Sequence, residues 1–141
     1  MIQPITLQWI QLETKDLSDY LIEEQLSALA PKNTILQDII ADVCAYIRQR
    51  IPSAWLPNPI KVNHLPDACK QAACHLVIEA LQTRMPELMA SEDQVRAADQ
   101  ARKTLDALFT DWNTQAKRWE PRIEAVNHRE HDVKQSTLKG L

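Results

Sequence analysis

The apolar residues of this chain recur every three or four positions in four separate stretches. That spacing places the apolar residues of each stretch on one face of an α-helix, so it predicts a protein built mainly from helices. The predicted helices cover residues 16–30, 33–51, 66–85 and 91–112. Two short helices with a break near Glu23–Gln25 would also fit the first of them. Prolines end helices, and they stand just after the first three, at positions 31, 52 and 86.

The start of the fourth predicted helix carries the clearest end signal. Ser91 and Gln94 form a capping box, in which the side chain of each accepts a hydrogen bond from the backbone N–H of the other. Farther along, Asp99 and Lys103 stand four residues apart, in the acid-before-base order that favours an ion pair. The sequence therefore predicts a helix that starts at Ser91 and exposes a charged side.

The remaining segments are predicted to be extended or irregular. Residues 5–9 alternate apolar and polar side chains, which is typical of a short half-buried strand or an extended arm. Residues 52–65 hold three prolines and form an irregular connection. Within it, Trp55 either folds back over the core, which is the favoured interpretation, or contacts a neighbouring molecule. Residues 117–141 carry few large apolar groups, so we expect a tail or an arm that orders on a partner.

These elements define the expected architecture. The fold class is mainly α, a bundle of about four helices with a short N-terminal extended arm and a C-terminal tail or arm. We expect a helical domain over residues 1–116 and a separate charged segment over residues 117–141. One domain is the natural count for 141 residues.

Glycine occurs once in the chain, at Gly140, although about ten glycines would be typical of this length. This scarcity excludes the glycine-rich phosphate-binding loops and the Gly-x-Ser-x-Gly nucleophile elbow, because both need glycines at fixed positions. It also disfavours the tight hairpins of an all-β fold. The bends must therefore come from proline, asparagine and loop length.

Charge and cysteine content favour a cytosolic chain with reduced thiols. There are 16 basic and 19 acidic residues, a net charge of −3, whereas nucleic-acid-binding domains usually carry a basic excess. Residues 1–12 lack the basic start and the cleavage site of a signal peptide, and they are too short to span a membrane. The cysteines number three, and an odd set in such a chain favours free thiols.

No residue pattern in the chain predicts catalysis, a metal site or a bound cofactor. Cys69 and Cys74 project about 140° apart around a helix, so they do not chelate one ion together, and small buried thiols are the better interpretation. His75 lies about 100° around the helix from Cys74, which disfavours a thiol–base pair. Glu79 follows His75 by four residues, and a hydrogen bond to solvent or to another helix is favoured over an acid–base pair.

Two groups of residues are candidates for contacts with partners. Arg118, Trp119 and Arg122 combine cations with an aromatic ring, as anchors of protein interfaces do. Single-stranded nucleic acid would use the same residue types, but the acids nearby favour a protein partner. Asp38 and Asp42 share the side of the second predicted helix opposite its apolar residues, either as a solvated face or as an acidic lining in an assembly.

Four segments also carry a resemblance to a known family. Residues 65–81, LPDACKQAACHLVIEAL, form a proline-opened helix that continues into an apolar run. Residues 39–50, IIADVCAYIRQR, combine small and aliphatic residues with a Tyr-Ile pair, and residues 9–17, WIQLETKDL, lead into an Asp-Leu helix start. Together with the helix of residues 95–112, they resemble the head–tail connector proteins of tailed phages, most closely those of Mu-like phages.

The resemblance covers about residues 9–112, and the chain departs from that family in two places. Many relatives have a glycine near the break in the first helix, where this chain has Ile22–Gln25. The residues beyond Trp112 match no pattern of the family, so any role for them follows from the family alone.

The resemblance implies a structural protein of the virion rather than an enzyme. Such proteins form a ring, dodecameric in known relatives, that docks on the portal protein and presents a platform to the tail or to a stopper or tail-terminator protein. Genomic DNA passes through the ring without specific binding. We would then expect assembly in the host cytoplasm, a final place at the head–tail interface, and portal or neighbour contacts from Trp55, Trp112, Arg118, Trp119 and Arg122. The same resemblance implies an acidic channel lining at Asp38 and Asp42.

The sequence also leaves an alternative of a different class open. A small cytosolic helical module that dimerises, or that binds nucleic acid in regulation or packaging, would show the same helices and the same overall composition. Salt-dependent binding of the isolated chain to duplex DNA would favour this alternative.

Overall fold

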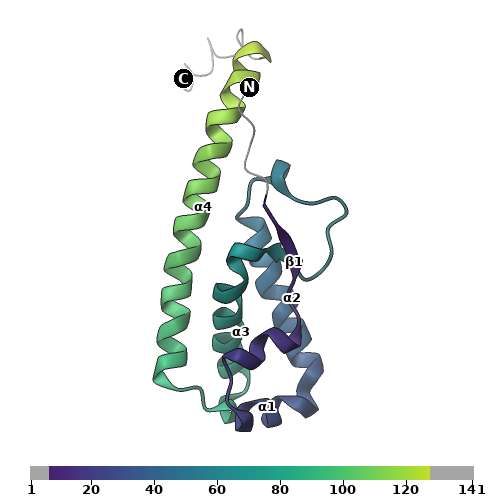
Figure 1. Ribbon diagram of the computed structural model, residues 1–141, viewed down its shortest axis with the longest axis vertical. Helices are drawn as coiled ribbons and strands as arrows, with labels where there is room; N and C mark the ends of the chain where they lie inside the picture. Colours follow the sequence, from purple (N-terminus) through teal and green to yellow (C-terminus); the bar gives the residue numbers. More distant parts are fainter. Residues whose placement is uncertain (1–6, 128–141) are drawn as a thin grey trace.

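The computed structural model describes residues 7–127, and their side chains up to residue 118. The chain is mainly helical, as predicted. Its helices are α1 (Glu23–Leu29), α2 (Asn33–Gln49), α3 (Lys70–Arg84) and α4 (Glu92–Asn127). Figure 1 shows α2, α3 and α4 running along one another, with α1 at the end where α4 begins. α2 begins at Asn33, the first residue of the predicted range, whereas a 3₁₀ turn at Asp67–Cys69 delays the start of α3.

The first predicted helix is two short helices. A 3₁₀-helix covers Thr14–Asp19, and α1 follows it after a break at residues 20–22. The break lies just before the expected position near Glu23–Gln25. The backbone N–H of Ile22 bonds to Gln25 Oε1 at 3.1 Å, so the new helix start is capped by a side chain of its own first turn.

A two-stranded antiparallel sheet joins the N-terminal segment to the connection between α2 and α3. Strand β1 (Trp9–Gln11) pairs with strand β2 (His64–Pro66), and Ile10 lies opposite Leu65. Of the strand or extended arm expected at residues 5–9, residues 5 and 6 lie outside the described residues, and the observed strand begins only at Trp9. Strand β2 was not predicted. Strands of three residues show too little alternation to be recognised from sequence. They also depend on each other for their hydrogen bonds, so neither is marked by its own segment alone.

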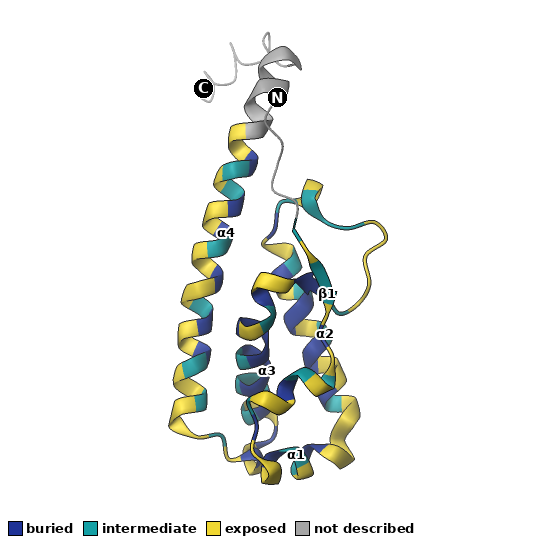
Figure 2. Cartoon of the chain, viewed as in Figure 1, coloured by how far each residue is buried: buried dark blue, intermediate teal, exposed yellow. Residues whose placement is uncertain are grey.

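The core of the protein lies around α3, which is packed between α2 and α4. Small side chains on α3 and α4 let these helices approach each other, and Ala98 and Ala101 of α4 are almost completely buried. The burial pattern in Figure 2 shows dark blue residues on the sides of α2 and α4 that face α3. The buried residues of α3 are Ala72, Ala73, Cys74, Leu76, Val77, Ile78 and Leu81.

Gln25 and Gln94 tie the first helix to the last. The two amides bond to each other in both directions, from Nε2 to Oε1, at 3.0 and 2.9 Å. Gln94 Nε2 also donates to the Tyr20 carbonyl at 3.0 Å, and Gln25 Nε2 donates to the Leu88 carbonyl at 3.3 Å. Gln25 is only 5% exposed, so its amide needs these partners to offset the water that it loses on folding.

α4 begins as predicted and ends later than predicted. The capping box is confirmed, because Ser91 Oγ accepts from the Gln94 N–H at 3.1 Å and Gln94 Oε1 accepts from the Ser91 N–H at 2.8 Å. The helix was expected to end near Trp112 but continues to Asn127. The domain boundary predicted after residue 116 thus falls inside α4 and stays a prediction. Residues 128–141 of the predicted tail lie outside the described residues.

The turn before α4 bends without a glycine. Met89 has φ 54° and ψ 55°, and it is the one residue with a positive φ among residues 7–127. This left-handed conformation is costly for a side chain with a Cβ atom. The Met89 side chain is 79% exposed, so packing contributes little to hold it there.

We expect Met89→Gly to stabilise the protein. Relief of the left-handed strain exceeds the extra entropy that glycine gives the unfolded chain, so the free energy of unfolding rises by about 1 kcal/mol. Urea unfolding of the purified variants measures this change. Met89→Ala keeps the Cβ atom and serves as the control, with a change within about 0.5 kcal/mol. A glycine variant no more stable than the alanine variant would contradict the left-handed turn.

Candidate functional site

The strongest polar contact between α3 and α4 is formed by Glu79 and Arg102. Both guanidinium NH groups of Arg102 donate to the Glu79 carboxylate, at 2.5 and 2.7 Å, and one of them also donates to Asp99 at 2.6 Å. The two carboxylates raise the pKa of Arg102 above its usual value. Glu79 thus makes a hydrogen bond to another helix, one of the two alternatives that the sequence favoured over an acid–base pair. Asp99, however, pairs with Arg102 rather than with Lys103, the partner expected from sequence.

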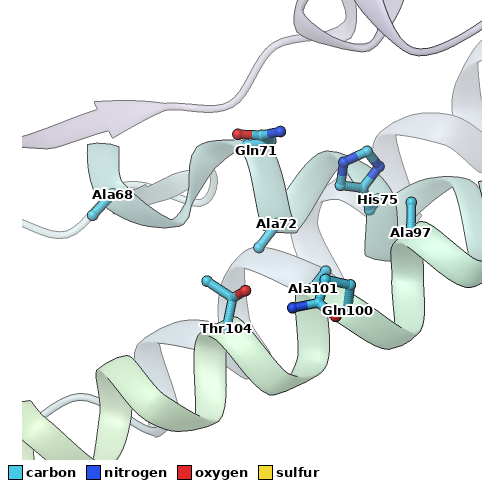
Figure 3. Close-up of a pocket in the computed structure, with 8 residues that line it drawn as sticks. All are labelled: Ala68, Gln71, Ala72, His75, Ala97, Gln100, Ala101 and Thr104. Carbon is cyan, nitrogen blue, oxygen red and sulfur yellow. The ribbon is translucent and has the colours of Figure 1, made fainter.

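A shallow groove of about 230 Å³ lies beside this contact, between α3 and α4. Figure 3 shows its two walls, with Ala72 and His75 on α3 and Ala97, Ala101 and Thr104 on α4. None of the residues that line the groove is charged, and none is a cysteine or serine. They are Ala68, Gln71, Ala72, His75, Ala97, Gln100, Ala101 and Thr104. The groove holds one hydroxyl, on Thr104, and one imidazole, on His75, but no hydrogen bond joins these two side chains as a nucleophile–base pair requires.

His75 is held as a half-buried imidazole rather than as part of an acid–base pair. Its ring packs edge-on against Tyr20, with 4.8 Å between the ring centroids. Burial lowers the pKa of His75 from its ordinary value of 6.5. Burial also raises the pKa of Tyr20, with a smaller contribution from Cys74. Both groups are therefore kept neutral near pH 7.

The three cysteines are buried in the core, as small apolar residues. Burial raises the pKa of Cys44 to about 11 and those of Cys69 and Cys74 to about 12. The Cys74 thiol lies 3.7 Å from the Asp16 carbonyl oxygen, an uncharged acceptor. Thiols held in the protonated form are poor nucleophiles and poor metal ligands. Among the side chains of residues 7–118, no group of three potential ligands comes together for a metal ion.

The residues chosen as contact candidates fall into different environments. Asp38 and Asp42 are exposed on α2. Trp55 is half-buried and packs against the hydrophobic core, which agrees with the favoured interpretation of a lid. Trp112 is only 4% exposed and packs near Phe109, with 6.3 Å between the ring centroids. A contact role for Trp112 must therefore be corrected, because the core of its own chain covers its ring.

Arg118 is exposed on α4 and is the last residue whose side chain is described. Trp119 and Arg122 belong to the same helix, but their side chains lie outside the described part of the chain. Their expected contacts stay predictions.

The sequence did not indicate the role of Arg50 at the end of α2. Its guanidinium lies 5.0 Å from the Phe109 ring centroid and 3.7 Å from an Asp106 carboxylate oxygen. Its carbonyl oxygen accepts a hydrogen bond from Asn113 Nδ2 at 2.9 Å. These contacts attach the end of α2 to α4. No local signal predicts them, since the partners stand more than fifty residues apart in the chain.

Comparisons with protein-family models, with curated proteins and with solved structures found no match for this chain. The resemblance to connector proteins therefore rests on the sequence segments named above. Within residues 7–127, no helix is both long enough and apolar enough to cross a membrane.

We expect His75→Gln to reduce the loss of stability in mild acid. The folded-state pKa of His75 lies below the unfolded value near 6.5, so the unfolded chain binds the proton more readily. Stability is then complete above about pH 6.5 and falls as the pH drops toward the lowered folded-state pKa. Urea unfolding at pH 7, 6 and 5 should show a shallower decline for His75→Gln. Gln100→Ala, across the groove, should keep the wild-type decline, and an equal decline in all three proteins would contradict the interpretation.

Proposed function

We propose that the chain is a structural subunit of a phage-type head–tail connector. In this role, copies form a ring on the portal protein and extend the DNA channel toward the tail or a stopper protein. The protein is assembled in the host cytoplasm and resides at the head–tail interface of the virion. The resemblance over residues 9–112 supports the family.

One observation carries the proposal beyond the resemblance: α4 runs out past the helical body. Its last buried residue among the described side chains is Ala116, and the helix continues to Asn127. Eleven further residues add about 16 Å of helix. Figure 1 shows this end of α4 extending beyond α2 and α3. A projecting helix suits an arm that clasps a larger partner better than it suits an isolated enzyme.

The state of the side chains that could take part in catalysis also supports a structural role. The three thiols are held protonated, His75 is held neutral, and Glu79 is committed to Arg102. Each of these groups contributes to packing or to helix attachment. The exposed acids Asp38 and Asp42 remain available for a channel lining or a subunit contact.

The proposal is tested by mixing the full chain with its cognate portal protein and examining the products by mass photometry and negative-stain imaging. We expect ring-shaped complexes in which several copies of the chain cover one end of the portal. Arg118→Glu should weaken portal binding about tenfold, because it reverses a charge next to the projecting part of α4. Glu24→Lys, an exposed reversal on α1, is the matched control and should bind normally.

Persistent monomers that do not bind the portal would contradict the connector role. The alternative, a module that binds nucleic acid, is tested by measuring the binding of the chain to duplex DNA across a salt series. Tight binding that weakens steeply with salt would favour the nucleic-acid-binding module instead.

A further inference from the structure

We propose that copies of this chain associate head to tail, with the outer face of α2 in one copy against the outer face of α4 in the next. This inference deepens the proposed function, and it rests on that function only in expecting the contact to close into a ring. The outer face of each helix is the side opposite its buried residues.

The outer face of α4 carries basic charge on a row of small and polar side chains. Its members are exposed and recur every three or four residues: Lys103, Ala107, Thr110, Thr114 and Arg118. The two charges in this row are both positive. The exposed acids Asp99, Asp106 and Asp111 border the row, and Asp99 and Asp106 are already paired with Arg102 and Arg50 of the same chain. Within the described side chains, no ion pair joins Lys103 or Arg118 to an acid.

The outer face of α2 has the opposite charge and similarly small side chains. Its members are Thr34, Asp38, Ala41, Asp42, Ala45 and Gln49, all exposed or half-buried. The only charges in this row are the two carboxylates. Neither Asp38 nor Asp42 forms an ion pair with another described side chain. Two acids four residues apart repel each other, so a cation from a partner would stabilise them.

The two faces also match in height along the helices. α2 and α4 run in the same direction, and the bond from Asn113 to the Arg50 carbonyl sets a common level. Below that level, Asp42 lies eight residues down α2 and Lys103 lies ten residues down α4. At 1.5 Å per residue these positions are about 12 and 15 Å down, and Asp38 is about 18 Å down. Copies placed side by side at equal height would therefore set Lys103 between the two carboxylates.

Small side chains surround this charged contact on both helices. By the same count, Ala45 of α2 lies at nearly the level of Ala107 and Thr110 of α4. Alanine and threonine allow helix axes to approach at the short end of the 8–10 Å range. Lys103 of one copy would then reach Asp38 and Asp42 of the next while the two helices stay in contact.

A second copy is the partner that these features favour, because the chain itself supplies both halves of the contact. α2 and α4 stand on either side of α3, and Figure 2 shows exposed residues along the side of α4 that faces away from α3. A symmetric contact of α2 with α2 would bring carboxylates together, and one of α4 with α4 would bring cations together. A head-to-tail contact instead repeats from copy to copy, which generates a ring or a filament.

The test is charge reversal in the full chain, with self-association measured by sedimentation velocity at low salt. D38K/D42K and K103E should each weaken association at least about tenfold, because like charges then meet. The combined variant D38K/D42K/K103E restores opposite charges with their signs exchanged, so it should associate within about threefold of wild type. E23K/E24K, an exposed reversal on α1, is the control and should associate normally. Circular dichroism of each variant verifies that its helices remain.

Cross-linking extends the test to weak association. Oxidation of D42C/K103C with copper phenanthroline should join the two engineered thiols of successive copies, with their hydrogens and electrons passing to the oxidant. A ladder of dimers, trimers and larger species is expected. The native thiols are buried with raised pKa values and should react slowly. E24C/K103C is the control pair and should give no ladder above dimer.

Equal association of all reversal variants would overturn the inference, as would a D42C/K103C chain that yields no ladder. These outcomes differ from a failure of the proposed function. Reversal-sensitive assembly without portal binding would contradict the connector role alone. Portal-bound rings that tolerate every reversal would contradict this interface alone.

Discussion

The close packing of α3 between α2 and α4 is the constraint on which the rest of the structure depends. Ala72 of α3 lies across a shallow groove from Ala97 and Ala101 of α4, and small residues at such positions let helix axes come close together. The approach brings Arg102 within reach of Glu79 and lets Gln94 reach Gln25. A larger side chain between α3 and α4 would separate the helices and break both polar contacts.

Local sequence signals were sufficient for the helices and for their best-marked ends. The Ser91–Gln94 capping box is confirmed because both partners lie in one turn, and the buried thiols followed from their apolar neighbours. Features that depend on distant residues escaped prediction. β2 exists only beside β1, and Arg50 acquires its role only when Phe109 and Asp106 pack against it.

Trp112 and α4 show how patterns of residue type mislead. Trp112 continues the apolar stripe of its helix and is buried there, although tryptophan is also a residue type that anchors interfaces. The scarcity of apolar residues after Gln115 suggested a tail, but α4 continues over this charged sequence to Asn127. The match between the outer faces of α2 and α4 could not be predicted from sequence, because the relative height of the two helices is set by the Arg50–Asn113 bond.

The central claim is that this helical body is a repeating structural unit whose α2 and α4 faces meet between copies. Electron cryomicroscopy of assemblies formed by the full chain tests it most directly. The account predicts α2 of each copy beside α4 of its neighbour, with Lys103 level with Asp38 and Asp42. Assemblies that leave either outer face in solvent, or a chain that stays monomeric at millimolar concentration, would contradict it.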